Sequence, residues 1–91
     1  MKNLPDDVLS YKRTPEFNRD TVPQGLLRAH QTKAGTWGLI VILEGRLSYT
    51  ILEPEREVVE LFPGFDGVVE PTVLHEVAPL GAVRFYVEFY R

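Results

Sequence analysis

The sequence contains no cysteine, which excludes disulfide bonds, thiolate metal ligands and cysteine nucleophiles. Serine is scarce as well, since Ser10 and Ser48 are the only two, and neither lies in the glycine-flanked setting of a nucleophilic serine. Histidine occurs only at His30 and His75. Few ways remain to build a catalytic centre, and the two histidines are the strongest candidates for a functional site.

A cluster of basic residues is also lacking, and the net charge is -3, so we expect no nucleic acid partner. No apolar stretch approaches the roughly 20 residues that a membrane-spanning helix needs. The first residues lack the charged-then-apolar pattern of a signal peptide. We therefore expect a cytoplasmic protein with no membrane contact.

The length of 91 residues and an apolar content of 44% predict a single domain over residues 1–91. Two separate cores could not each bury enough apolar surface to offset the entropy lost on folding. Prolines at positions 5, 15 and 23 predict that residues 1–25 form an irregular arm, with one strand around Leu9 to Arg13.

The chain is predicted to be all-β, because short segments rich in β-branched and aromatic residues alternate with glycine and proline. Residues 37–43 and 46–53 read as a hairpin that turns at Glu44-Gly45, and residues 56–62 and 65–71 as two further strands. A second hairpin is predicted over residues 74–91, with its turn at 79–82. Edge strands of small barrels are often covered by a second subunit, so we expect a homodimer.

Several motifs resemble the two signature segments of the cupin superfamily: EGRLSY, the later PG and EP pairs, and the histidine that follows them. The whole chain resembles, more closely, the small cupin-like family of tellurite-resistance proteins of the TehB type. The matching segments are YKRTPEF, HQTKAGTWGLIVILEGRLSY, VEPTVLHEV and VEFYR. This resemblance implies a small double-stranded β-helix, or jelly-roll, barrel of about eight strands.

The resemblance also implies a cavity that can hold a metal, with His30 supplied by the first signature segment and His75 by the second. Thr32 stands where cupins usually carry a second histidine, so a third ligand is needed. The predicted second hairpin sets Tyr86 opposite His75 and brings Glu88 to the same face.

Glu88 is therefore the first candidate for the third ligand, and Glu70 is the second. Alternatively, Glu88 faces solvent and pairs with Arg84, and water completes the site. Without thiolates, the ion would be zinc, iron, manganese, nickel or copper.

Three further residues are candidates for contact with a small-molecule or oxyanion ligand. Lys33 would attract an anion at the pocket mouth, or else is simply solvated. Trp37 would form a pocket wall, or else packs in the core. Tyr86 would assist with charge.

The function expected from these features is a metal-binding module that binds or senses a small molecule, linked to tellurite or a related oxyanion stress. One alternative is a small metal-dependent enzyme of the dioxygenase or isomerase type, and another is a metal-free interaction module. Some relatives join such a domain to a methyltransferase. No glycine-rich nucleotide fold is present here, so we do not expect this chain to be a methyltransferase by itself.

Overall fold

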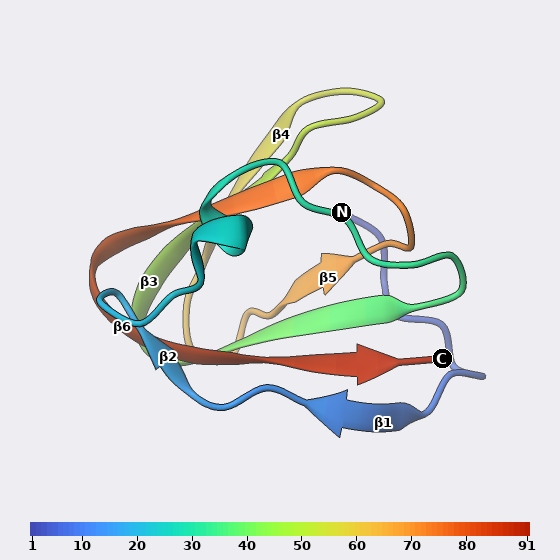
Figure 1. The fold of residues 1–91 in the computed structure, drawn as a ribbon, viewed down its shortest axis with the longest axis horizontal. Coiled ribbons are helices and arrows are strands. Elements are labelled where there is room, and N and C mark those ends of the chain that lie inside the picture. The colour runs from blue at the N-terminus through green and yellow to red at the C-terminus, as the bar shows by residue number, and fades with distance from the viewer.

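Two long antiparallel strands, β3 (Trp37–Ile51) and β6 (His75–Tyr90), form the centre of the structure, a computed structural model of residues 1–91. They pair along nearly their whole length, from Trp37 opposite Tyr90 to Ile51 opposite His75. Figure 1 shows this two-stranded ribbon bending back on itself at one side of the molecule. The bend brings the two halves of the ribbon face to face, and the core lies between them.

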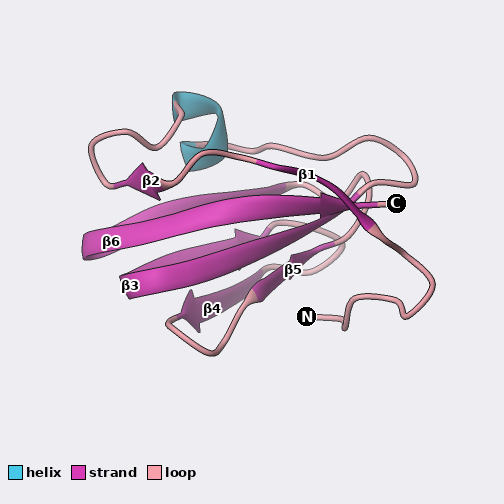
Figure 2. Ribbon diagram, turned by 90° about the horizontal axis from the view of Figure 1, so that it is seen from below, coloured by secondary structure: helices cyan, strands magenta, loops and turns pink.

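Four shorter strands complete one antiparallel sheet of order β1-β6-β3-β4. β1 (Ser10–Arg13) and β2 (Phe17–Asn18) pair with β6, whereas β4 (Glu57–Leu61) and β5 (Gly67–Val69) pair with β3. A 3-10 turn, η1 (Gln24–Leu27), lies on the β6 side of the sheet, and β4 and β5 lie on the other side (Figure 2). The strands predicted near residues 9–13 and 56–62 and within residues 65–71 are thereby confirmed.

Both predicted hairpins are wrong. Residues 37–51 and 75–90 are each a continuous strand, and each pairs with the other rather than with itself. The predicted register fails with them, because Tyr86 lies opposite Val41 and not opposite His75. The sequence signals that suggested turns mark the bend of the ribbon instead.

Gly45 explains why a turn signal serves as a bend. Its φ is +78°, and the pairing between β3 and β6 shifts register on either side of it, as at a β-bulge. A Cβ atom here would overlap the carbonyl oxygen of Ala82 and lie 3.0 Å from Cα of Val83. Glycine is therefore required because the neighbouring strand approaches too closely for any side chain.

The bulge also changes which residues of β3 face the core. Before it, the even positions Ile40 and Ile42 are buried; after it, the odd positions Leu47, Tyr49 and Ile51 are buried. A one-residue shift moves side chains to the opposite face of a strand, and the bulge supplies that shift. Leu47, Tyr49 and Ile51 therefore share one core face.

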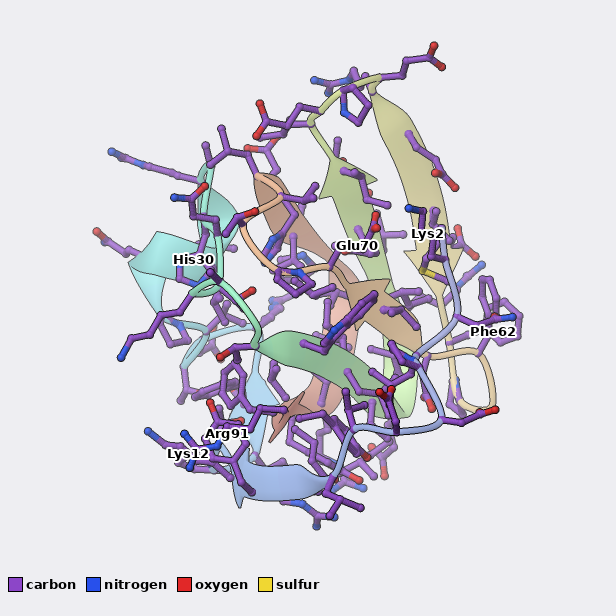
Figure 3. The ribbon with its side chains drawn as sticks, turned by 90° about the vertical axis from the view of Figure 1, so that its right-hand side faces the viewer. Lys2, Lys12, His30, Phe62, Glu70 and Arg91 are labelled. Atoms are coloured by element: carbon purple, nitrogen blue, oxygen red, sulfur yellow. The ribbon has the colours of Figure 1, made fainter.

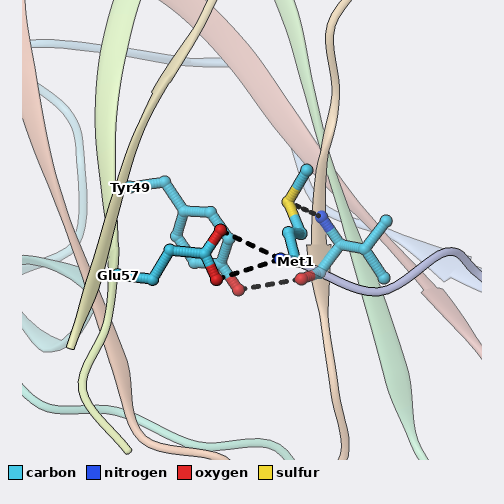
Figure 4. Close-up of polar contacts among 4 residues, drawn as sticks. Met1, Tyr49 and Glu57 are labelled. Atoms are coloured by element: carbon cyan, nitrogen blue, oxygen red, sulfur yellow. Dashed lines mark hydrogen bonds and ion pairs between the residues drawn. The ribbon is translucent and has the colours of Figure 1, made fainter. Parts of the chain in front are cut away.

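The first 25 residues are more regular than predicted, because they contribute β1, β2 and the start of η1. Phe17 packs its ring edge-on against the fully buried Phe85, with ring centroids 5.7 Å apart. At the other side of the sheet, the amino group of Met1 donates to both carboxylate oxygens of Glu57 at 2.9 Å (Figure 4). The segment thus covers the sheet on two sides.

The expected jelly-roll barrel of about eight strands is corrected to a bent sheet of six strands. β1 and β4 form the two edges of the sheet path, and they do not pair with each other, so the sheet does not close. No helix in the structure has the length and apolar character needed to cross a membrane.

Candidate functional site

A cavity of about 240 Å³ lies between the two halves of the bent sheet, and η1 contributes to its wall. Its lining is mostly apolar, and its only ionisable side chains are two histidines. The fifteen lining residues are Thr14, Phe17, Pro23, Gly25, Leu26, His30, Thr32, Gly38, Ile40, Val69, His75, Val77, Phe85, Val87 and Phe89.

His30 and His75, although far apart in the chain, meet in this cavity, as the sequence predicts. They form an isolated β-bridge in which each backbone N–H donates to the other's carbonyl oxygen at 2.8 Å. Residues paired in this way carry their side chains on the same side of the two chains, and the imidazole centroids lie 5.3 Å apart with the rings nearly perpendicular. The bridge therefore holds the two imidazoles side by side.

His75 is the buried member of the pair, with only 4% of its surface exposed. Burial lowers its pKa, and the nearby His30 acts in the same direction, although the hydrogen bond to the Val73 carbonyl opposes them. The side chain is thus held in its neutral form near pH 7. Tyr49 packs edge-on against the ring, with its own hydroxyl donating to the carbonyl of Val68 at 2.9 Å.

The hydrogen bonds of His75 determine which ring nitrogen carries the proton. Nδ1 lies 3.2 Å from the carbonyl oxygen of Val73, which accepts only, so Nδ1 carries the proton and donates. In a neutral imidazole, Nε2 is then an acceptor. No protein group bonds to Nε2, yet the chain has no fully buried side-chain nitrogen or oxygen without a partner, so Nε2 is open to the cavity.

Glu88 does not join the histidines. It accepts a hydrogen bond from the Ser10 hydroxyl at 2.5 Å and an ion pair from Arg13 at 3.2 Å, on the β1 side of the sheet. The Ser10 hydrogen bond and the Arg13 charge hold the pKa of Glu88 below its usual range. Arg84, which the alternative prediction paired with Glu88, instead forms ion pairs with Glu16 and Glu44.

The remaining predicted residues also lie outside the cavity lining. Tyr86 lies under the guanidinium of Arg13, whose central carbon is 4.2 Å from the ring centroid. Lys33 is exposed in the turn before β3, and Trp37 begins β3 opposite Tyr90. Glu70 forms an ion pair with Lys2 at 3.2 Å, and in Figure 3 both lie apart from His30, which is beside the helical turn.

Sequence reasoning missed the residues that shape the cavity. Phe17, Leu26, Phe85 and Phe89 supply much of its apolar wall, and they come from β2, η1 and β6. Hydrophobicity by itself indicates that such residues are buried, but not that they surround a cavity. Thr32, noted as a replacement for a histidine, does line the cavity, although its hydroxyl is occupied in donating to the carbonyl of Thr36 at 2.7 Å.

Residues 12–87 of this chain match the model of the TehB-like domain family. The chain belongs to the TehB-like domain family. Two curated relatives, from Haemophilus influenzae strains Rd and 10810, are each 33% identical over 84 residues. Both are named as probable S-adenosyl-L-methionine-dependent methyltransferase TehB, and the match covers 88% of this chain but only 28% of each relative.

Two solved structures share the fold of this TehB-like domain. The crystal structure of TehB from Haemophilus influenzae is 28% identical with a TM-score of 0.85, covering 93% of this chain and 32% of that one. The crystal structure of a protein from Escherichia coli K12 has a TM-score of 0.89 and covers 100% of this chain and 97% of that one. At 21% identity, the second likeness concerns the fold alone.

These findings correct the expected metal-binding function and the expected transition metal. The curated relatives are named for S-adenosylmethionine, an organic cofactor, and not for a metal. The structure also brings no three histidine or carboxylate side chains together in a group that could hold an ion. Two imidazoles alone hold a divalent ion poorly, and with Glu88 engaged by Ser10 and Arg13 the third ligand is missing.

Proposed function

We propose that this TehB-like domain serves S-adenosylmethionine-dependent methyl transfer by holding a small methyl acceptor in the cavity between the halves of its sheet. The observation that carries the proposal is the apolar cavity with a neutral imidazole at its wall. The names of the Haemophilus relatives supply the reaction class. The family link to tellurite resistance is consistent with this class.

The size of the cavity limits the occupant to a small molecule. Pockets for drug-sized ligands measure roughly 300 to 1,000 Å³, whereas a dry cavity of about 150 Å³ is enough to bind benzene. The cavity of about 240 Å³ falls between these limits. It suits a single ring or a short chain with a few substituents.

S-adenosylmethionine itself does not fit the residues of this cavity. The cofactor carries a sulfonium cation, an amino-acid group and an adenosine, and a buried cation needs an anionic partner. The lining contains no aspartate or glutamate, and the volume is below that of drug-sized pockets. We therefore assign the acceptor, and not the cofactor, to this cavity. In the relatives, the cofactor would be held by the part of the chain that the domain does not cover.

The experiment has a binding arm and a transfer arm. In the first, calorimetric titration of the purified chain compares S-adenosylmethionine with phenol and thiophenol as small acceptors. In the second, extract from cells that lack the chain is supplied with labelled S-adenosylmethionine and an acceptor, and the label transferred is measured with and without the purified protein.

Binding of the acceptors together with increased transfer supports the proposal. Tight binding of S-adenosylmethionine by the chain alone would overturn the assignment of the cavity. Binding of acceptors with no gain in transfer would overturn the link to methylation.

We also propose that the chain forms a homodimer, which the exposed edge strand β1 supports. Leu9 beside this strand is 75% exposed, and Tyr11 within it is 42% exposed. An edge with unpaired backbone groups and exposed apolar side chains favours pairing with a second copy. Light scattering tests this: a dimer that a Tyr11→Lys substitution converts to monomer supports it, and a wild-type monomer contradicts it.

A further inference from the structure

We propose that the cavity selects its occupant by a single hydrogen-bond donor that meets Nε2 of His75. The site would then prefer the unmethylated acceptor over the methylated product. This inference rests on the proposed function and deepens it, because it names the class of ligand. The ligand class is a small, neutral, mostly apolar molecule with one acidic X–H group, such as a phenol or a thiol.

Nε2 of His75 is the buried free acceptor of this cavity. The hydroxyl of Thr32 is committed to the Thr36 carbonyl. The hydroxyl of Thr14 is also committed, because it donates to the Pro15 carbonyl and accepts from the N–H of Val87 at 2.9 Å. Nε2 of His75 has no such partner, and its tautomer is fixed by the Val73 carbonyl. His30 is less buried than His75, so its ring can bond to solvent.

Leaving Nε2 unpaired in an occupied cavity costs binding free energy. Ile40, Val77 and Phe85, all buried, are among the apolar residues that line the cavity with His75. A ligand that fills the cavity displaces any water from Nε2. An acceptor buried without a donor then loses binding energy that a donor-bearing ligand keeps. The cavity therefore discriminates between molecules of similar shape by the presence of one donor.

Methyl transfer removes the donor on which this discrimination depends. S-adenosylmethionine, held outside this cavity, would supply the methyl group, so that an X–CH₃ bond replaces the sulfonium–methyl bond. The proton of X–H would pass to Nε2 of His75, to which it is hydrogen-bonded, and from there to solvent. The product lacks the donor that Nε2 requires, and it is larger by a methyl group. The same contact that recognises the acceptor therefore disfavours the product, which favours product release.

The test is a titration of the purified chain with phenol, anisole and toluene, which share a ring but differ at one substituent. We expect phenol to bind about 10- to 100-fold more tightly than anisole or toluene, the range that one unpaired buried acceptor predicts. In the same samples, the ¹⁵N signal of His75 Nε2 should move in the direction of hydrogen-bond acceptance with phenol and stay unmoved with toluene. The nitrogen signal reports the contact in the wild-type protein, so it does not depend on any variant folding.

Two variants separate the acceptor from the structural role of His75. His75→Asn keeps a donor near the position of Nδ1 for the Val73 carbonyl but removes the acceptor at Nε2. His75→Gln extends its amide to the position of Nε2 and restores an acceptor there. We expect the preference for phenol to disappear in His75→Asn and to persist in His75→Gln, with toluene binding similar in both.

The outcomes distinguish this inference from the proposed function. Equal affinity for phenol and anisole in the wild type, or an unmoved Nε2 signal, would overturn the inference and leave the acceptor-binding proposal standing. A preference for phenol with no effect on label transfer would overturn the proposed function and leave the donor selectivity intact. If none of the three rings binds, both fall together.

Discussion

Replacement of Gly45 by alanine tests the central finding about the fold, that β3 continues through a bulge instead of ending at a hairpin turn. Gly45 has a φ of +78°, and a Cβ atom there would overlap the carbonyl oxygen of Ala82 on β6. Gly81 makes a matched control, because its φ is also positive, +96°, but a Cβ atom there meets nothing within 4 Å. The two substitutions share backbone strain and differ in packing.

The magnitudes follow from these two contributions. A non-glycine residue with left-handed backbone costs about 1–2 kcal/mol, and this is the whole expected effect at Gly81. At Gly45 the overlap with a neighbouring backbone adds about 1–3 kcal/mol, because two strands must separate to admit the methyl group. We therefore expect Gly45→Ala to lower the free energy of unfolding by about 2–5 kcal/mol. For a domain of this size, each kcal/mol lowers the Tm by about 4–8 °C.

Urea titration and calorimetry of the wild type, Gly45→Ala and Gly81→Ala give the comparison directly. Gly25→Ala serves as a second control, since Gly25 lacks a positive φ and has open space around it. Equal losses for Gly45→Ala and Gly81→Ala would refute the reasoning. That result would mean that Gly45 lies in an open turn, as the hairpin expected from the sequence required.

Since burial lowers the pKa of His75, the unfolded chain takes up a proton at this side chain before the folded protein does, so stability should fall as pH decreases below about 6.5. Urea titrations from pH 7.5 to 5 should show this slope, which His75→Gln should reduce. Tyr49→Phe removes the hydroxyl that donates to the Val68 carbonyl, so it should lower the free energy of unfolding by about 1–2 kcal/mol in the same assay. Glu88→Gln should leave phenol affinity unchanged by calorimetry, because the carboxylate contacts Ser10 outside the cavity; a large loss would contradict this placement.

The sequence predicted the histidine pair but not its surroundings. His30 and His75 were the only histidines, and the idea that a β-fold unites them was confirmed by the bridge between them. Glu88 and Tyr86 were predicted to lie at the site of His75 from the register of a hairpin. That register was wrong because β6 pairs with β3 and not with itself. Side chains alternate between the two faces of a strand, but the pairing partner decides which residues they meet across the sheet.

The amino-acid sequence by itself determined that this TehB-like domain is all-β, that its strands lie near the observed positions, and that its two histidines are the notable polar groups. Local composition is sufficient for these features, because strand and turn preferences act over a few residues. Only the tertiary structure decided that Gly45 bends a strand and that an apolar cavity surrounds His75. These features depend on contacts between residues far apart in the chain, such as Gly45 with Ala82 and Phe17 with Phe85. No local pattern encodes such distances.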